Sequence, residues 1–153
     1  MIYRKMTCVP MEEAHLDALA AISAKTADPW SRDSLAAELG RKDASASVLL
    51  VDGEPMGFVC FRVMWGGAEL LMVALDESLR GQGLGTQFLR GCVQALAKDD
   101  VERVILEVRE SNAPAIRVYE KMGFELLCRR ENFYEKPAED GFTMELQLAP
   151  AAL

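Results

Sequence analysis

With 153 residues, half of them apolar, the chain is long enough for one domain, spanning 1–153, that buries a core without metal or disulfide support. Its formal charge of −7 argues against nucleic-acid binding, which needs clustered Lys and Arg; net acidity favours basic partners or simply aids solubility. No stretch approaches the roughly 20 apolar residues that span a bilayer, and no apolar signal core follows the N-terminus, so we expect a soluble, cytoplasmic protein without membrane contacts.

The first half of the chain predicts two helices after an opening strand. Residues 2–9 are typical of a strand and residues 11–27 of a helix. Asp28-Pro29-Trp30-Ser31 breaks this helix, and Ser31 can cap a second, short helix over 34–39.

Strands follow these helices. Residues 47–51 and 56–63 flank a turn at 52–55, which predicts an antiparallel hairpin. A further strand is expected over 69–75, after Gly66 and Gly67.

A glycine-rich turn joins that strand to an amphipathic helix over 84–96, and its sequence is Arg80-Gly81-Gln82-Gly83-Leu84-Gly85. The first N–H groups of a helix lack carbonyl partners, and the helix dipole adds positive charge there, so an anion fits. Glycines remove the Cβ atoms that would hold a pyrophosphate away from these amides, and Arg80 can add a counter-charge. Neither the Gly-Lys-Ser/Thr loop nor the Gly-x-Gly-x-x-Gly fingerprint is present. The turn therefore predicts a phosphate-binding loop of another kind, and the alternative is an ordinary glycine-rich turn.

The second half predicts a parallel strand–helix–strand unit. Residues 101–108 have the continuous apolar centre of a covered strand, one helix away from the strand over 69–75. Pro114 suits the first turn of another helix, which stops at Gly123. Strands are expected over 124–129 and 143–148, with a loop over 135–141, so the chain is predicted to be an α/β fold with a mixed sheet.

Cysteine and histidine residues predict no metal site. The cysteines are spread singly, without a Cys-x-x-Cys pair, and we interpret them as reduced core residues: Cys8, Cys60, Cys92 and Cys128. His15 is the only histidine, and we expect it on the surface of the first helix.

The order of elements, with the turn at 80–85 opening the central helix, resembles the GCN5-related N-acetyltransferases (GNAT), whose signature is Gln/Arg-x-x-Gly-x-Gly/Ala. The resemblance spans nearly the whole chain. It implies a mixed, mostly antiparallel sheet whose central parallel strand pair splays at the cofactor site, flanked by about four helices. It also implies acetyl-coenzyme A as cosubstrate and no metal. The residues that would contact the cofactor are Val73, Leu75, Arg80, Gly81, Gln82, Gly83, Leu84, Gly85, Thr86 and Asn112.

Within this family, segments 28–31, 106–112, 118–124 and 130–134 resemble the bacterial ribosomal-protein-alanine acetyltransferases, which acetylate the α-amine of a ribosomal protein. The resemblance implies transfer to the N-terminal peptide of a ribosomal protein by direct attack in a ternary complex. We expect a monomer or a weak homodimer. The alternatives are a small-molecule amine or a lysine side chain as acceptor and, in another class, a non-catalytic acyl-coenzyme A sensor.

The resemblance also assigns residues to the reaction. Glu107 would be the general base, and its alternative is a strand-end glutamate paired with an arginine such as Arg109. Tyr119 would hand a proton to the departing thiolate, and its alternative is an aromatic packed on a helix face. Asn112 can cap its helix as well as contact the cofactor. The peptide groove would be flanked by three aromatic residues that can equally be core: Trp30, Phe133 and Tyr134.

Overall fold

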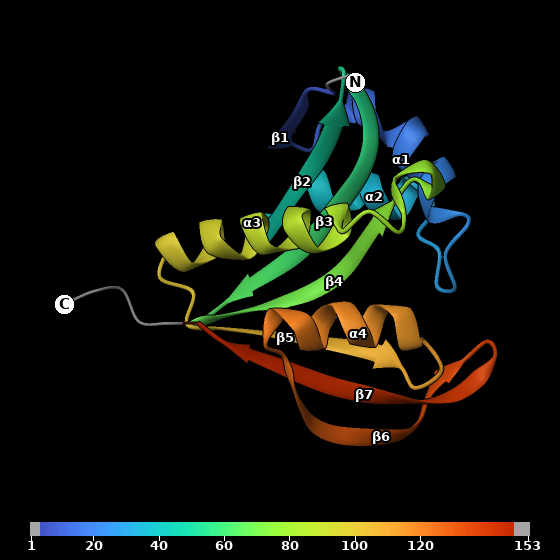
Figure 1. Ribbon diagram of the computed structural model, residues 1–153, viewed down its shortest axis with the longest axis vertical. Helices are drawn as coiled ribbons and strands as arrows, with labels where there is room; N and C mark the ends of the chain where they lie inside the picture. The colour runs from blue at the N-terminus through green and yellow to red at the C-terminus, as the bar shows by residue number, and fades with distance from the viewer. Residues whose placement is uncertain (1–3, 149–153) are drawn as a thin grey trace.

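A computed structural model describes residues 4–148 of the chain (Figure 1). Its strands are β1 (Met6–Pro10), β2 (Ala44–Val51), β3 (Glu54–Met64), β4 (Gly67–Leu75), β5 (Arg103–Arg109), β6 (Glu125–Glu135) and β7 (Ala138–Gln147). Its α-helices are α1 (Leu16–Ser23), α2 (Arg32–Leu39), α3 (Leu84–Lys98) and α4 (Ala113–Met122), and short 3₁₀ turns span Glu13–His15 and Glu77–Leu79.

All of these strands belong to one mixed sheet, in the order β1-β2-β3-β4-β5-β7-β6. The β4–β5 pair is parallel, and every other neighbouring pair is antiparallel. The parallel pair arises because α3 carries the chain back across the sheet between β4 and β5, as the strand–helix–strand pattern predicts. The predicted hairpin of β2 and β3 is confirmed.

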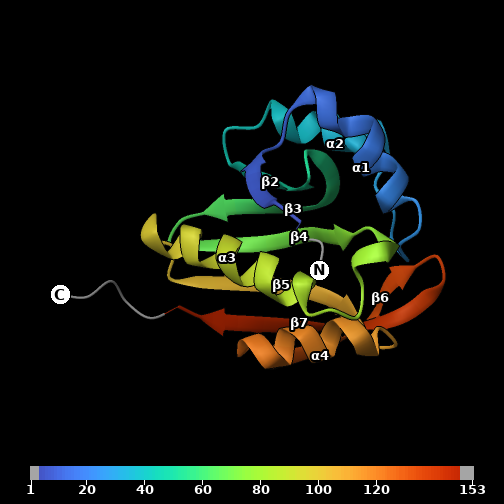
Figure 2. The same cartoon turned by 45° about the horizontal axis from the view of Figure 1, so that its top comes forward.

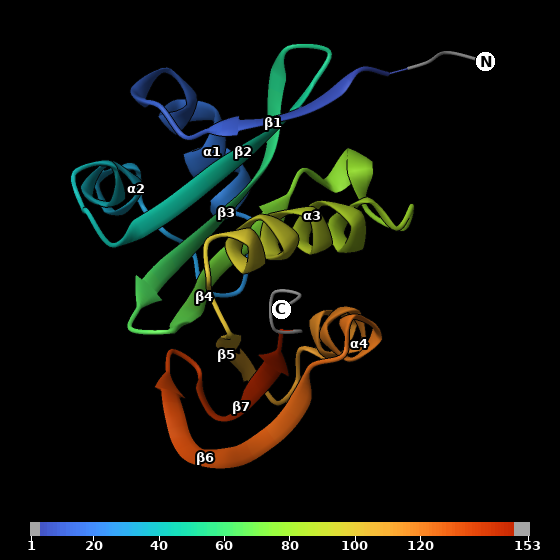
Figure 3. The same ribbon diagram turned by 90° about the vertical axis from the view of Figure 1, so that its left-hand side faces the viewer.

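Helices cover both faces of the sheet, with α1 and α2 on one face and α3 and α4 on the other (Figures 2 and 3). Strand β3 is buried on both faces: Phe58 and Cys60 pack in the core under α1 and α2, whereas Val59 and Phe61 pack in the core under α3 and α4. Burying an aliphatic or aromatic side chain of this size contributes about 1.5–3 kcal/mol, so these two cores hold the layers together.

The parallel ladder breaks in the middle of β4. Pairing between β4 and β5 runs only from Gly67–Arg103 to Leu70–Leu106. At the same place the register between β3 and β4 skips Leu71, since Phe61 pairs with Leu70 and Cys60 with Met72. A bulge of this kind bends a strand, and beyond it β4 and β5 diverge (Figure 1). The splayed parallel pair implied by the resemblance is thereby confirmed.

Most predicted elements differ in their bounds from the structure by a few residues, and the first helix and the opening strand show why. The helix expected over 11–27 is a 3₁₀ turn followed by α1, because the Glu12 N–H donates to His15 Nδ1 and starts the helix there. The helix ends at Ser23, whose carbonyl and hydroxyl oxygens accept from Thr26 and from the Trp30 N–H. The opening strand expected over 2–9 is found from Met6, and its residues 2 and 3 lie outside the described residues.

The prediction of a loop over 135–141 is wrong. Strands β6 and β7 pair up to Glu135–Ala138, which leaves only a tight turn between them. Polar residues form a strand here because they have partners: Arg129 pairs with Asp140, and Glu139 accepts from the Ser111 N–H.

The cysteines divide into two groups, contrary to the prediction that all of them are core residues. Cys60 and Cys92 are buried, whereas Cys8 and Cys128 lie on edge strands and are exposed. His15 is half-buried rather than fully on the surface.

Candidate functional site

The loop that precedes α3 presents open space in front of the helix amides. Gly83, the residue before the helix, and Gly81 both have left-handed backbones, with φ of 74° and 77°. A Cβ atom at either position would meet nothing within 4 Å, so these glycines are required by backbone conformation and leave the approach clear. Arg80 is exposed beside them. The loop therefore fits a diphosphate, which the orphan N–H groups of the first helical turn can bind.

Leu75, the last residue of β4, lies close to the start of α3. A Cβ atom on Gly85 would lie 3.2 Å from Leu75 Cδ1, so the glycine allows the helix to begin close to the strand. The Gln82 side chain donates to the Ser78 carbonyl and helps to hold the loop. Leu84 packs against the core under α3, and Thr86 lies half-buried in the first turn.

A cavity of about 310 Å³ lies where β4 and β5 diverge. Its lining comes from β4, β5, β6, α4 and the segment between α1 and α2. It brings together seven of the residues singled out in the sequence: Trp30, Val73, Glu107, Asn112, Tyr119, Phe133 and Tyr134. Leu75 and the residues of the glycine-rich loop do not line this cavity. The loop and the cavity are thus two neighbouring sites, joined by the end of β4.

Glu107 is held by two donors that its own strand does not supply. Thr143 Oγ1 donates to Oε2 at 2.7 Å, and Arg130 Nη1 donates to Oε1 at 3.3 Å. The Glu107 side chain is 18% exposed. The alternative of a glutamate paired with an arginine is confirmed, but the partner is Arg130, whereas Arg109 pairs with Asp28 and Glu139. The arrangement leaves a partly buried carboxylate that faces the cavity.

Tyr119 is buried on α4 and also lines the cavity. Burial, with a smaller contribution from Tyr134, raises the pKa of Tyr119 to about 12. Its ring packs 5.6 Å from the ring of Phe124, so the packing alternative and the cavity-facing role coexist. The phenol stays protonated over the whole physiological pH range.

The remaining predicted residues shape the rim. Asn112 Oδ1 accepts from the Ala115 N–H at 3.3 Å, which confirms that Asn112 caps α4. Phe133 and Tyr134 form an edge-to-face pair with centroids 4.9 Å apart. Trp30 is half-buried against the core under α1 and α2. Burial raises the pKa of Tyr134 to about 12, so its hydroxyl also stays neutral.

Four polar residues of the site were not found from the sequence: Asp28, Arg130, Glu139 and Thr143. Their partners lie between 23 and 81 residues away along the chain. One of them carried a signal: if β5 and β7 are paired in the right register, Thr143 stands directly opposite Glu107. The contacts of Asp28, Arg130 and Glu139 depend on the paths of loops and edge strands, which the sequence pattern does not predict.

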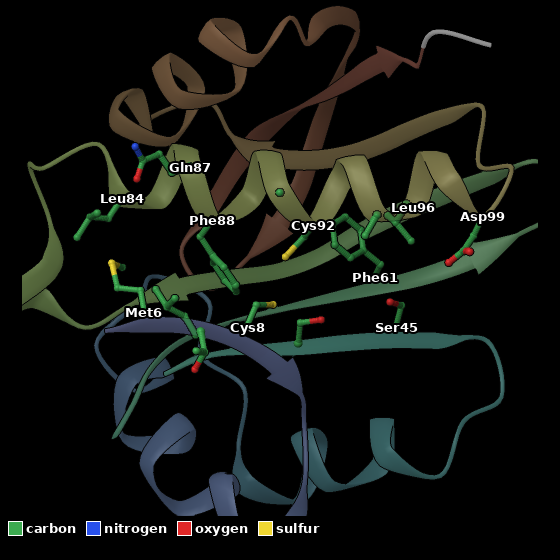
Figure 4. Close-up of a pocket in the computed structure, with 15 residues that line it drawn as sticks. Met6, Cys8, Ser45, Phe61, Leu84, Gln87, Phe88, Cys92, Leu96 and Asp99 are labelled. Atoms are coloured by element: carbon green, nitrogen blue, oxygen red, sulfur yellow. The ribbon is translucent and has the colours of Figure 1, made fainter. Parts of the chain in front are cut away.

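A second cavity, of about 480 Å³, lies between β1, β2 and α3 (Figure 4). Its walls are largely apolar and include Phe61, Phe88 and Leu96. Cys8 and Cys92 also line it, and the two thiols point into the same space from opposite walls (Figure 4). Burial raises the pKa of the Cys92 thiol to about 12, with a further contribution from the neighbouring Cys8 thiol.

Residues 4–148 hold no cluster of three or more His, Cys, Asp and Glu side chains arranged to bind a metal ion. Over the same range, no helix combines the length and the apolar character needed to cross a bilayer.

Known proteins resemble this chain in sequence and in fold. The model of the acetyltransferase (GNAT) family matches residues 13–124. The [ribosomal protein bS18]-alanine N-acetyltransferase of Escherichia coli K12 is 35% identical over 113 residues, which cover 74% of each chain. An N-alpha-acetyltransferase of Sulfurisphaera tokodaii is 33% identical over 119 residues, covering 69% of this chain and 71% of the relative.

Solved structures give the same result. The crystal structure of the ribosomal-protein-S18-alanine N-acetyltransferase from Escherichia coli superposes with a TM-score of 0.88 and 31% identity, over 97% of both chains. The NatC complex bound to Gag peptide and CoA shares the fold, with a TM-score of 0.80 at 17% identity over 95% of this chain and 99% of that one. The family match, the identity to relatives and the shared fold lead to one conclusion: this chain belongs to the acetyltransferase (GNAT) family.

Proposed function

We propose that the protein transfers the acetyl group of acetyl-coenzyme A to the N-terminal α-amine of a ribosomal protein that begins with alanine. The observation that carries the proposal is the cavity beside the end of the β4–β5 pairing, because Glu107, Tyr119 and the aromatic residues of the rim all line it. The identity to the [ribosomal protein bS18]-alanine N-acetyltransferase of Escherichia coli supports the choice of acceptor.

The glycine-rich loop would hold the coenzyme. Backbone N–H groups at the start of α3 bind the diphosphate, with Arg80 as counter-charge, and main-chain groups of Val73 and Leu75 orient the pantetheine and the acetyl carbonyl. Bound acetyl-coenzyme A supplies an activated thioester. The pairing of β4 and β5 ends at Leu70 and Leu106, which line the cavity, and the thioester would meet the amine there.

Glu107 would act as the general base, directly or through a water molecule. An α-ammonium has a pKa of about 7.7–8.0 and costs about 1–1.4 kcal/mol to deprotonate at pH 7, whereas a lysine side chain, near 10.4, costs about 4.6 kcal/mol. Thr143 and Arg130 donate hydrogen bonds to the two carboxylate oxygens of Glu107, which lines the cavity. The lower cost of deprotonation favours the α-amine over the lysine side chain as the acceptor.

Tyr119 would act on the leaving group of the reaction. Its neutral phenol donates a hydrogen bond, or its proton, to the thiolate that leaves. Because the pKa of Tyr119 is about 12 and that of an ordinary thiol about 8.5, full transfer is uphill, and stabilisation of the thiolate by the hydrogen bond contributes to the rate.

A matched peptide panel tests this function. The first peptide has a free N-terminal alanine and no lysine. The second differs from it only in a blocked N-terminus and one internal lysine, and small amines complete the panel. We expect kcat/KM to be highest for the free alanine. Preference for lysine or a small amine would contradict the acceptor, and acetyl-coenzyme A binding without transfer to any amine would favour the sensor.

A further inference from the structure

Arg109 has a partner for every N–H group of its guanidinium. Nε and Nη2 donate to the two carboxylate oxygens of Asp28, at 2.9 and 2.8 Å. Nη1 donates to the Pro137 carbonyl at 2.9 Å and to Glu139 Oε1 at 3.2 Å, and Nη2 donates to the Lys136 carbonyl at 3.1 Å. A guanidinium has five N–H donors, and all five are used here. This explains how the side chain can be only 5% exposed.

The partners of Arg109 lie on two segments that are distant in sequence. Asp28 belongs to the segment between α1 and α2, 81 residues away, which also carries Trp30. Lys136, Pro137 and Glu139 form the turn and the first residues after β6, the strand that carries Phe133 and Tyr134. Arg109 therefore connects the two walls of the cavity.

Arg109 lies on β5, the strand that also carries Glu107, the proposed general base. Arg109 is two residues beyond Glu107, so both side chains leave the strand on the same face. The Arg109 Cζ atom also lies 4.3 Å from the centre of the Tyr134 ring, which places a cation on the aromatic wall. The strand that presents the carboxylate thus also fixes the walls around it.

We propose that Arg109 is a positioning residue that sets the spacing of the peptide groove by holding the α1–α2 segment and the β6–β7 turn together. This inference rests on the proposed function, because it concerns the acceptor side of the same site. Lysine cannot replace the arginine, since an ammonium lacks the planar fork that matches a carboxylate in two parallel hydrogen bonds. The Asp28 carboxylate raises the pKa of Arg109 above its ordinary value, so the guanidinium keeps its charge at any working pH.

Asp28→Asn tests the proposal with little risk to folding, because the Asp28 side chain is half-exposed. Its amide group would face the guanidinium donors and break the paired hydrogen bonds. We expect the KM for the alanine peptide to rise about 10-fold, with kcat within about twofold of wild type and the KM for acetyl-coenzyme A unchanged, since a binding contact is lost without a change in the chemistry. Arg109→Lys should shift the peptide KM in the same direction.

Asp17→Asn is the matched control, because the exposed Asp17 of α1 accepts from Arg32 of α2 at 2.7 Å. It should leave all three kinetic constants unchanged. The proposal would be overturned if Asp28→Asn lowered kcat and raised both KM values to the same extent. It would also be overturned if Asp28→Asn and Arg109→Lys both kept the wild-type peptide KM. A wild-type enzyme that acetylates no peptide would instead contradict the proposed function.

The thiols of the second cavity carry a separate inference. Cys8 is exposed on the edge strand β1, and Cys92 is buried on α3, yet both sulfurs face the same space (Figure 4). From this juxtaposition we infer that Cys8 and Cys92 are a modification site, which a small disulfide such as oxidised glutathione converts into an internal disulfide. The Cys8 thiolate attacks the small disulfide and releases one thiol. Cys92 then loses its proton, attacks the Cys8 sulfur and releases the second thiol, so two thiols are oxidised and one disulfide is reduced.

Mass spectrometry of the oxidised protein tests this site. We expect a monomer that is lighter by two hydrogens, with Cys8 and Cys92 in one cross-linked peptide, and full reversal by a reducing thiol. Cys128→Ser is the matched control, since Cys128 is also exposed, and it should still form the cross-link. Cys8→Ser should abolish it. A lasting glutathione adduct on Cys8 beside a free Cys92, or a disulfide between two chains, would contradict the inference.

Discussion

At the level of single residues, the site is defined by the neighbours of two ionisable groups. Glu107 lines the cavity, and Thr143 and Arg130 donate to its two side-chain oxygens. Tyr119 remains a phenol because it is buried. These surroundings support the proposed roles of Glu107 as general base and Tyr119 as general acid.

The raised pKa of Tyr119 predicts the alkaline side of the pH–rate profile. The acid form of the phenol is the useful one, so a pKa of about 12 extends activity to higher pH than the ordinary value of 10 would. We expect kcat for the alanine peptide to stay level between about pH 9 and 10.5, and Tyr119→Phe to lower it about 100-fold. Stopped assays across this range provide the measurement, and a halving of the wild-type kcat near pH 10 would contradict the account.

Some residues of the site were accessible from the sequence and others were not. Glu107 and Tyr119 were identified through a family resemblance. Without it, the residues beside Glu107 equally fit an ordinary strand end, and those beside Tyr119 equally fit an aromatic packed on a helix face. Asp28 and Arg130 lie in segments that carry the family resemblance, but no pattern predicted their contacts, since these depend on the exact path of loops and edge strands. Local periodicity contains no information about such contacts.

At the level of elements, the strength of the local pattern decided which predictions were confirmed. Helix α3 was predicted to within a few residues, because its apolar stripe and its glycine-rich start agree. The β6–β7 turn was missed, because residues 135–141 are polar and their strand pairing relies on distant partners such as Arg109. The bulge at Leu71 has no sequence signal of its own, although it helps to open the site.

Two glycines of the α3 region should respond in opposite ways to the same substitution. Gly91 is exposed inside the helix with nothing within 4 Å of its would-be Cβ, so Gly91→Ala should raise the free energy of unfolding by about 0.5–1 kcal/mol. Gly83 has φ of 74°, where an L side chain is strained by about 1–2 kcal/mol. Gly83→Ala should therefore lower stability and weaken coenzyme A binding.

Urea denaturation and calorimetric titration with coenzyme A measure both effects. Gly91→Ala serves as the control for coenzyme binding and should leave the affinity unchanged. If the two substitutions shift stability in the same direction, the left-handed assignment of the loop is wrong.

At the level of the whole molecule, hydrogen bonds to carboxylates connect the elements around the proposed peptide-binding cavity. The Ser111 hydroxyl and N–H lower the pKa of Glu139, and the Asn132 N–H lowers the pKa of Asp140. Outside this region, Arg41 lowers the pKa of Asp43. A folded-state pKa below the unfolded value stabilises the protein above that value, and the stabilisation is lost as the pH falls and the group is protonated.

Acid should therefore destabilise the fold in a defined window. The ordinary pKa values are 3.8 for Asp140 and 4.5 for Glu139, so we expect the melting temperature to hold from pH 7 to about 5.5 and to decline progressively below about pH 4.5. Asp140→Asn removes one of the groups and should make the decline shallower. Thermal melts at low ionic strength test this, and a melting temperature that rises on acidification would refute it.

The central claim is that acetyl transfer takes place where β4 and β5 part, with Glu107 receiving the proton of the amine. The most direct measurement compares wild type with Glu107→Gln for turnover of the alanine peptide and for coenzyme A affinity by calorimetry. Glu54→Gln, an exposed position at the start of β3, serves as the control. The account predicts a loss of kcat of at least about 100-fold with unchanged coenzyme A affinity. Turnover by Glu107→Gln at the wild-type rate would contradict it.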